Sequence, residues 1–418
     1  MLAAICERAG VRVAHNMSGA NLRSGLASTL LTAPRDTQLL LLETDEATLP
    51  LVAPDLQPDV IVLCNLFRDQ LDRYGELEAL ADRWRETLLA LNPSRVTICF
   101  NADDPLIAEL VESYVSRAHE NGHEARTIAF GCEDPSVAAP GLPHAADSKF
   151  CRRCGTALDY ARSYVGHLGE FRCPGCGFAR PPADVRAVGI KLDGLAASEL
   201  QIELPDGGVV RARLRIPGLY NAYNALGAVA AASAMALEPA DIVEGLAGFS
   251  PAFGRFERIT IPNIGTLTLL LVKNPTGLNE VVRTLIGSGA DLSACLFALN
   301  DGIADGRDTS WIWDADIEPL LARAPALVVT GDRAAEFALR AVYGGADADS
   351  LIVEEDVEAA LFLLLERARD FSQHGHAYAL VTYTAMLRMR AAISAQGWVP
   401  AYWRGQTGEP GERVVAAP

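Results

Sequence analysis

Four cysteines in the middle of the chain have the spacing of a metal centre. Cys151 and Cys154 form one pair in CRRCG, and Cys173 and Cys176 form a second pair in CPGCG, with eighteen residues between the pairs. Each pair fits one tight turn, and the glycine after each pair permits the positive φ that such a turn needs. Two facing turns of this kind form a closed tetrahedral thiolate site, which is typical of structural zinc. Two disulfides or four unligated thiols are the alternatives.

The remaining five cysteines lie mostly in apolar stretches and show no pairing pattern; they are Cys6, Cys64, Cys99, Cys132 and Cys295. This usage is typical of a reduced cytoplasmic protein. The zinc site is therefore expected to be an element of the fold, and the chemistry of the protein must come from other residues.

Composition and charge limit the class of protein. A chain of 418 residues has room for two or three domains, and its net charge of −17 argues against a nucleic-acid-binding face. No apolar run approaches the roughly eighteen residues of a membrane span. The first ten residues, MLAAICERAG, lack the basic start and the uninterrupted apolar stretch of a signal peptide. We expect a soluble, cytoplasmic protein without a transmembrane segment.

Apolar runs of strand length alternate with helical patterns, which predicts an α/β fold with a parallel, doubly wound sheet. The expected strands of the first domain, residues 1–257, are VRVAHN, TQLLLLETDE, DVIVLCN, RVTICFNADD and RTIAFG. A cysteine module at residues 145–182 interrupts them as an insertion, and 185–216 follow as a pair of hairpins. A smaller α/β domain is expected over 258–400, and 401–418 are expected to form a disordered tail.

Polar residues at the ends of these elements are candidates for ligand binding. Glu43 ends the strand LLLLE, where a carboxylate is well placed to hold Mg²⁺ on a nucleotide, although a solvated turn is equally plausible. Asn221 and Asn224 lie one helical turn apart and could read an adenine edge or serve as capping groups. Arg255 in FGRFE could reach a phosphate or form a surface salt bridge. Asp104, before Pro105, is expected to be a helix N-cap.

The order of E-T-D-E, N-L-F-R-D-Q-L-D-R-Y-G, N-A-D-D, G-L-Y-N-A-Y-N and G-R-F-E resembles the Mur ligase family of ATP-dependent ligases. The cysteine module, LVKNPTGLNE and NDGIADGRDTSWIWD narrow the resemblance to the MurT-type synthetase subunits, which pair with a GatD-type glutaminase. The resemblance covers residues 1 to about 395. It implies a Mur ligase-like ATP-binding domain with a zinc-ribbon insertion and a smaller C-terminal domain.

The resemblance also implies a reaction and roles for single residues. ATP would phosphorylate the α-carboxylate of D-glutamate in lipid II at the membrane surface, and ammonia from GatD would convert the acyl phosphate to D-isoglutamine. Asp308 would complete the partner's Cys–His pair as a triad, although its segment also reads as a turn whose side chains bind their own backbone. Glu43 would hold Mg²⁺, Asn221 and Asn224 would contact adenine, and Arg255 would approach the phosphates or ribose.

The chain departs from the Mur ligase pattern in three places. Gln70 stands where these ligases generally carry a histidine, and 75–91 contain no lysine, so a second metal site is not expected. No segment matches the P-loop G-x-x-x-x-G-K-[ST] or the family's GTNGKT, and we expect such a loop in an upstream extension before Met1. An amino-acid-adding Mur or folylpolyglutamate-type ligase and a catalytically dead, zinc-stabilised scaffold remain as alternatives.

Overall fold

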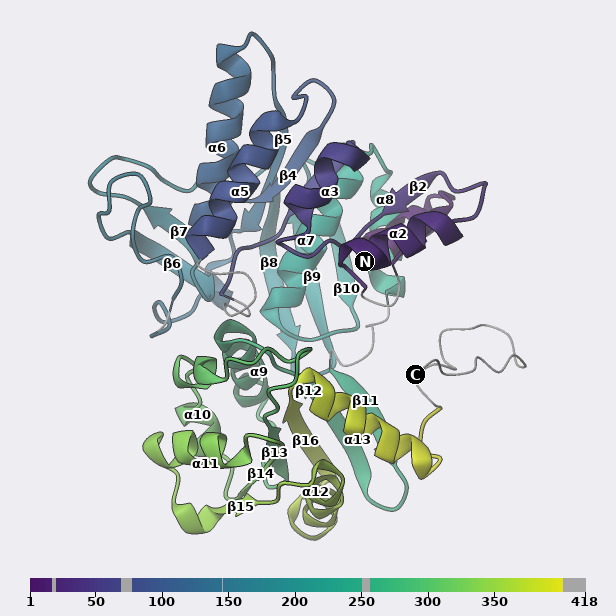
Figure 1. The fold of residues 1–418 in the computed structure, drawn as a ribbon, viewed down its shortest axis with the longest axis vertical. Helices are drawn as coiled ribbons and strands as arrows, with labels where there is room; N and C mark the ends of the chain where they lie inside the picture. The colour runs from purple at the N-terminus through teal and green to yellow at the C-terminus, as the bar shows by residue number, and fades with distance from the viewer. Residues whose placement is uncertain (17–19, 69–76, 145, 250–255, 401–418) are drawn as a thin grey trace. The chain divides into compact units, whose positions relative to one another are not determined.

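A computed structural model describes residues 1–16, 20–68, 77–144, 146–249 and 256–400. The chain divides into two compact units, one of Met1–Ser250 with Arg283–Ser288 and the other of Pro251–Val282 with Gly289–Pro418 (Figure 1). Each unit contains a six-stranded sheet with helices on its faces. The predicted tail, 401–418, lies outside the described residues.

The first unit is built on a mixed sheet of strand order β10-β9-β8-β5-β4-β3. Its parallel part comprises β3 (Val60–Leu63), β4 (Thr97–Asn101), β5 (Arg126–Cys132) and β8 (Val185–Asp193). The antiparallel strands β9 (Ala197–Glu203) and β10 (Val209–Leu214) extend it. The predicted α/β class is confirmed, and the predicted hairpin pair is this β8–β9–β10 meander.

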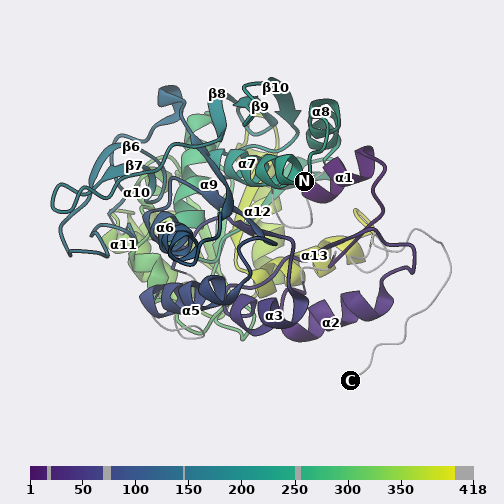
Figure 2. The same ribbon diagram turned by 90° about the horizontal axis from the view of Figure 1, so that it is seen from above.

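Helices cover both faces of this sheet because β4 alternates its side chains between two cores. Ile98 and Phe100 join the core formed with α5 (Leu77–Ala90) and α6 (Pro105–Glu120). Cys99 points the other way, into the core formed with α7 (Leu219–Ala234). Figure 2 shows α7 and α5 in separate layers. The doubly wound arrangement therefore follows from buried strands that are apolar on both sides.

The N-terminal segment adds elements around the α7 layer. Helix α1 (Leu2–Arg8) packs on α7 and on α8 (Pro239–Gly248). Strands β1 (Val13–His15) and β2 (Leu39–Leu41) pair with each other in parallel, as a ladder separate from the six-stranded sheet. Helices α2 (Arg23–Thr32) and α3 (Leu49–Leu56) flank β2 along the chain. The expected strands at VRVAHN and TQLLLLETDE are thus present, in a ladder of their own.

The cysteine module occupies the connection between the parallel neighbours β5 and β8. The connection begins with a short 3₁₀ turn, η1 (Pro135–Val137), and the module contains an antiparallel hairpin of β6 (Asp159–Val165) and β7 (Leu168–Arg172). Single bridges from Phe150 to Ala157 and from Arg172 to Ala179 flank the hairpin.

The second unit has a sheet of strand order β11-β12-β16-β13-β14-β15. Only the β11–β12 pair is antiparallel. The strands are β11 (Glu257–Ile261), β12 (Gly265–Leu271), β13 (Cys295–Ala298), β14 (Leu327–Thr330), β15 (Leu351–Val353) and β16 (His376–Val381). The helical elements are η2 (Ser310–Trp313), α10 (Glu318–Leu321), α11 (Ala334–Tyr343), η3 (Ala348–Ser350), α12 (Val357–Phe371) and α13 (Tyr383–Ala395), together with the part of α9 (Pro275–Gly287) that precedes Arg283.

Strand β13 alternates in the same way as β4. Leu296 and Ala298 pack with α12 and α13, while Phe297 stacks on Phe337 of α11 with ring centroids 3.6 Å apart. Among the described residues of both units, no helix combines the length and the apolarity that crossing a membrane requires.

Candidate functional site

The four predicted metal ligands come together in the structure. The Sγ atoms of Cys151, Cys154, Cys173 and Cys176 all lie within 4.8 Å of one another. Cys151 and Cys176 are 3.6 Å apart and Cys154 and Cys173 are 3.4 Å apart. Thiolates on a tetrahedral zinc ion are about 3.8 Å apart, because each Zn–S bond is about 2.3 Å, whereas a disulfide needs about 2.05 Å. The cluster therefore fits zinc and excludes disulfides among these four residues.

Two matching backbone turns form the cluster. In the first, Cys151 N–H donates to Thr156 O at 2.8 Å and Gly155 N–H donates to Cys151 O at 2.7 Å. In the second, Cys173 N–H donates to Phe178 O at 2.7 Å and the glycine after Cys176 donates to Cys173 O at 3.0 Å. Gly155 has φ +74°, which a residue with a side chain adopts only at a cost.

The environment of the thiols differs between the first and second cysteine of a turn. Hydrogen bonds with Thr156 lower the pKa of Cys154 to about 6. Burial raises the pKa of Cys151 to about 12. A bound cation favours the thiolate form of a cysteine ligand, so a metal would offset the effect of burial on Cys151.

The cysteine module is fastened to the two helices on one face of the sheet. Arg152 pairs with Asp82 of α5 at 2.6 Å, and Arg153 pairs with Glu112 of α6. The Arg153 guanidinium also lies 4.1 Å from the centroid of the Phe178 ring. The two cysteine turns are thus held against α5 and α6 of the first unit.

Glu43 lies two residues beyond β2, and its side chain is exposed. Its backbone is tied to Asn16, because Glu43 N–H donates to Asn16 Oδ1 at 2.9 Å and Asn16 Nδ2 donates to Glu43 O at 2.8 Å. Burial raises the pKa of Cys64 to about 11, and the Glu43 and Glu46 carboxylates add to the rise, although part of Cys64 reaches solvent. Cys64 directly follows β3, at the carboxyl end of the strand, where a parallel sheet binds ligands.

The two asparagines at the start of α7 already have partners in the protein. Asn221 is buried, and its Nδ2 donates to Pro217 O at 2.7 Å. Asn224 is half-buried, and its Nδ2 donates to Asn221 Oδ1 at 3.3 Å. Asn221 is therefore engaged by the backbone before α7 but does not cap the helix, which has Gly218 at its N-cap, and Asn224 is the more accessible amide.

The predicted cap at Asp104 is confirmed. Its Oδ1 accepts hydrogen bonds from Leu106 N–H at 2.9 Å and from Ile107 N–H at 3.3 Å. Arg255 lies outside the described residues, as does the segment containing Gln70.

Asp308 lies in the second unit, on the loop between β13 and η2, and is exposed. Its Oδ1 accepts a hydrogen bond from Ser310 N–H at 2.8 Å. Contacts on both sides anchor the loop: Arg333 pairs with Asp301 at 2.7 Å, and Thr309 donates to Glu336 at 2.7 Å. An exposed carboxylate on an anchored loop is available to a group from another chain.

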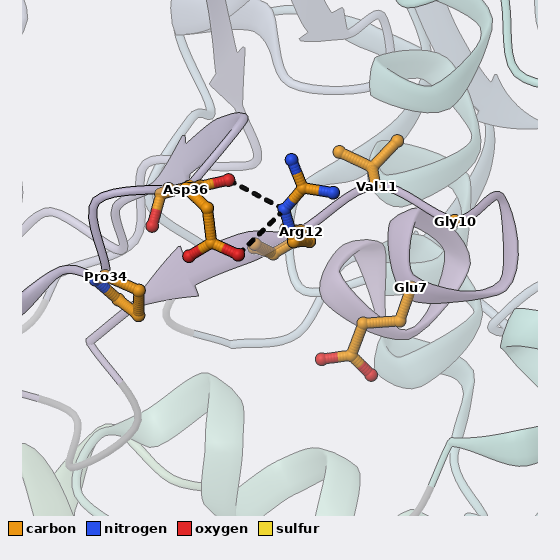
Figure 3. Close-up of a pocket in the computed structure, with 8 residues that line it drawn as sticks. Glu7, Gly10, Val11, Arg12, Pro34 and Asp36 are labelled. Carbon is orange, nitrogen blue, oxygen red and sulfur yellow. Dashed lines mark hydrogen bonds and ion pairs between the residues drawn. The ribbon is translucent and has the colours of Figure 1, made fainter.

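A hollow of about 410 Å³ lies at the amino ends of β1 and β2 (Figure 3). Arg12 and Asp36 form an ion pair in its lining, with 3.1 Å between Nε and Oδ2. Its lining residues come from α1, from the start of β1 and from the segments before the two strands, and none is a predicted site residue. Because ligands bind at the carboxyl ends of parallel strands, we do not assign this hollow to the reaction.

Sequence reasoning missed two groups that make contacts in the structure: Asp147 and His167 of the cysteine module lie beside the loop after β3. Asp305, expected only as part of the turn around Asp308, accepts hydrogen bonds at the start of α13. Their partners lie far away in the chain, and no local pattern marks them.

Comparison with known proteins adds independent evidence. The family model described as MurT ligase C-terminal matches residues 271–386. The chain is 31% identical over 389 residues to a protein of Streptococcus pneumoniae (strain ATCC BAA-255 / R6) named lipid II isoglutaminyl synthase (glutamine-hydrolyzing) subunit MurT. That alignment covers 92% of this chain and 81% of the relative.

Two solved structures show the same fold. A pseudomurein peptide ligase type C from Methanothermus fervidus matches with a TM-score of 0.69 at 19% identity, over 94% of this chain and 75% of that chain. The MurF ligase of Thermotoga maritima in complex with ADP matches with a TM-score of 0.61 at 13% identity, over 93% of this chain and 75% of that chain.

Proposed function

This chain belongs to the MurT family, and we propose that it is the ATP-dependent synthetase subunit of a lipid II isoglutaminyl synthase. Family membership supports a ligase acting on lipid II. The finer steps, the acyl phosphate and the glutaminase as ammonia source, are part of the proposal. A GatD-type glutaminase is the proposed partner in a heterodimer.

In the proposed reaction, an oxygen of the α-carboxylate of D-glutamate in the lipid II stem peptide attacks the γ-phosphorus of ATP. This step forms an acyl phosphate and releases ADP. Ammonia then attacks the acyl carbon, phosphate leaves with the electrons of the C–O bond, and loss of a proton leaves the amide of D-isoglutamine. Catalysis of phosphoryl transfer depends mainly on positioning and on stabilising negative charge.

Residues of the first unit would serve the nucleotide. Glu43, exposed just beyond the carboxyl end of β2, would hold Mg²⁺, which neutralises phosphate charge when bound. Asn224 has the more accessible amide for adenine, with Asn221 behind it, and Arg255 would approach the phosphates or ribose. The four cysteines would hold a structural zinc ion, since a closed thiolate site leaves no position open for substrate.

The exposed carboxylate of Asp308 is the observation that carries the glutaminase part of the proposal. A Cys–His pair in the partner becomes an efficient nucleophile when a carboxylate orients the imidazole and stabilises its charged form. Asp308 offers Oδ2 for this purpose, since only Oδ1 is engaged among the hydrogen bonds of the described residues.

The test is amidation by the chain co-purified with its glutaminase partner. With lipid II, ATP and glutamine, we expect mass spectrometry to show conversion of the D-glutamate carboxyl group to an amide. Glutamine should be hydrolysed in proportion to the amide formed. An amino-acid-adding ligase would need no partner and would extend the substrate by a whole residue. A scaffold would give neither product, and either of these outcomes would overturn the proposal.

A further inference from the structure

The loop that leaves β3 is held by carboxylates from two other parts of the first unit. Leu66 N–H donates to Asp104 Oδ2 at 2.7 Å, from the start of α6. Arg68 N–H donates to Asp147 Oδ2 at 3.1 Å, and the Arg68 guanidinium pairs with the same carboxylate. Asp147 belongs to the cysteine module and its side chain is only 5% exposed. An ion pair shielded in this way is geometrically specific, because both partners lose most of their water.

His167, at the tip of the β6–β7 hairpin, lies between these two carboxylates. Its side chain has no exposed surface, with Nε2 3.4 Å from Asp104 Oδ2 and Nδ1 3.9 Å from Asp147 Oδ2. Neither ring nitrogen has a hydrogen-bond partner among the described residues. The ring packs against Phe67, with centroids 4.8 Å apart. A buried polar side chain without hydrogen bonds lowers stability, so packing alone does not account for a histidine at this point.

Short backbone connections link these contacts to the thiolate centre. Ser148 O accepts a hydrogen bond from Tyr160 OH at 2.8 Å, and Lys149 O accepts one from Leu158 N–H at 2.9 Å. The first zinc turn begins at Cys151, directly after this segment. The position of Asp147 therefore depends on the turn that the metal stabilises.

Residues 65–68 follow the carboxyl end of β3, and ligands of parallel α/β sheets bind at this end of the strands. We propose that the cysteine module positions residues 65–68, with Asp147 and His167 acting through Arg68 and Phe67, so that zinc occupancy sets the affinity for Mg·ATP. The positioning step stands on the contacts alone, while the effect on Mg·ATP rests on the proposed function. Asp147 and His167 are thus positioning residues, and neither is assigned a contact with substrate.

Hydrogen exchange of the Arg68 amide, measured on the chain in its complex, tests the positioning step. Asp147→Ala removes the acceptor, and we expect exchange about tenfold to a hundredfold faster, as loss of a hydrogen bond to a charged group implies. Asp147→Asn keeps an acceptor oxygen and should restore part of the protection. His167→Gln, Cys151→Ser and zinc removal by a chelator should each accelerate exchange at the same amide.

Arg162→Ala is the matched control, because Arg162 lies on the same hairpin and pairs with Glu170 on its exposed side, at 2.5 Å. It should leave Arg68 exchange unchanged. Unchanged Arg68 exchange in zinc-free protein and in Asp147→Ala would overturn the inference and leave the module a purely structural insertion.

Steady-state kinetics of the same variants test the link to the nucleotide. We expect KM for Mg·ATP to rise about tenfold in Asp147→Ala, with a smaller change in kcat. Faster Arg68 exchange with an unaltered KM would overturn the nucleotide link. An inactive wild-type complex would instead count against the proposed function, and the exchange measurement would still decide the positioning step.

Discussion

Asp305 and Thr384 join two distant parts of the C-terminal unit. The Asp305 carboxylate accepts a hydrogen bond from Thr384 N–H at 2.7 Å and another from the Thr384 hydroxyl at 2.5 Å. Asp305 is almost fully buried, and its negative charge lies at the N-terminus of α13, where the helix dipole favours it. The carboxylate thereby anchors the middle of the loop that carries Asp308.

Replacing Asp305 should reduce the contribution of Asp308 to glutamine-dependent amidation while Asp308 itself stays in place. We expect Asp305→Ala to lower glutamine-dependent amidation about tenfold, because loss of two hydrogen bonds to a carboxylate lets the loop move. Amidation with free ammonia should stay near the wild-type rate, since it bypasses the glutaminase. The ratio of the two rates is the measurement.

Asp356→Ala is the control for this prediction. Asp356 accepts a hydrogen bond from Ala359 N–H at 2.8 Å at the start of α12 and is exposed, so its loss should cost about 1 kcal/mol of stability and leave the ratio unchanged. The effects of Asp305→Ala and Asp308→Asn should also be non-additive, since one acts through the other. Equal loss of both activities would make Asp305 only structural.

Asp308→Asn should abolish most glutamine use while leaving the fold intact. The exposed position makes the substitution mild for stability, and the lost charge is the one proposed to orient the partner's imidazole. We expect glutamine-dependent amidation to fall at least about 100-fold, with partial rescue by ammonia. Full glutamine-dependent activity would return Asp308 to the role of a turn residue that caps Ser310.

Purified protein should contain close to one zinc ion per chain. Cys151→Ser or Cys173→Ser should lose it and lower the stability of the first unit by more than about 2 kcal/mol, or about 4–8 °C in Tm. Cys64→Ser, outside the cluster, should retain the metal. Absence of zinc, with all four thiols alkylated in the folded protein, would contradict the assignment.

Substitutions of the two asparagines of α7 should have different effects on stability and on KM for ATP. Asn221→Ala removes the donor to Pro217 O in a buried position, and it should cost about 1–3 kcal/mol of stability. Asn224→Ala should change stability little and raise KM for ATP. Thermal denaturation and ATP titration of both variants measure the difference, and an unchanged KM in Asn224→Ala would argue against adenine contact.

Asp291 should give the second unit an acid-sensitive contribution to stability. Hydrogen bonds from Ser293, Gln373 and Ser372 lower the pKa of Asp291 to about 2. In the unfolded chain the pKa is about 3.9, so the unfolded state binds more protons between these values. The stability that ionised Asp291 contributes is fully present above about pH 4 and is lost as the pH falls toward 2. The Tm difference between wild type and Asp291→Asn should shrink over that interval.

Local spacing determined several features of this protein from the sequence. The paired cysteines predict the two turns of the thiolate centre, because each turn closes within a few residues and its glycine supplies the positive φ. Apolar runs alternating with helical patterns predict the α/β class, since the period of the side chains fixes which surfaces are buried. Asp104 before Pro105 predicts the cap of α6 for the same local reason.

Tertiary structure alone decided which distant groups meet. Arg68 finds Asp147 across 79 positions, and Thr384 finds Asp305 across the same separation. The amide of Asn221, which the sequence left open between adenine and a cap, is engaged by Pro217 once the preceding turn folds. Such partners leave no periodic trace, because burial and charge complementarity act between elements whose order in space is set only when the sheets assemble.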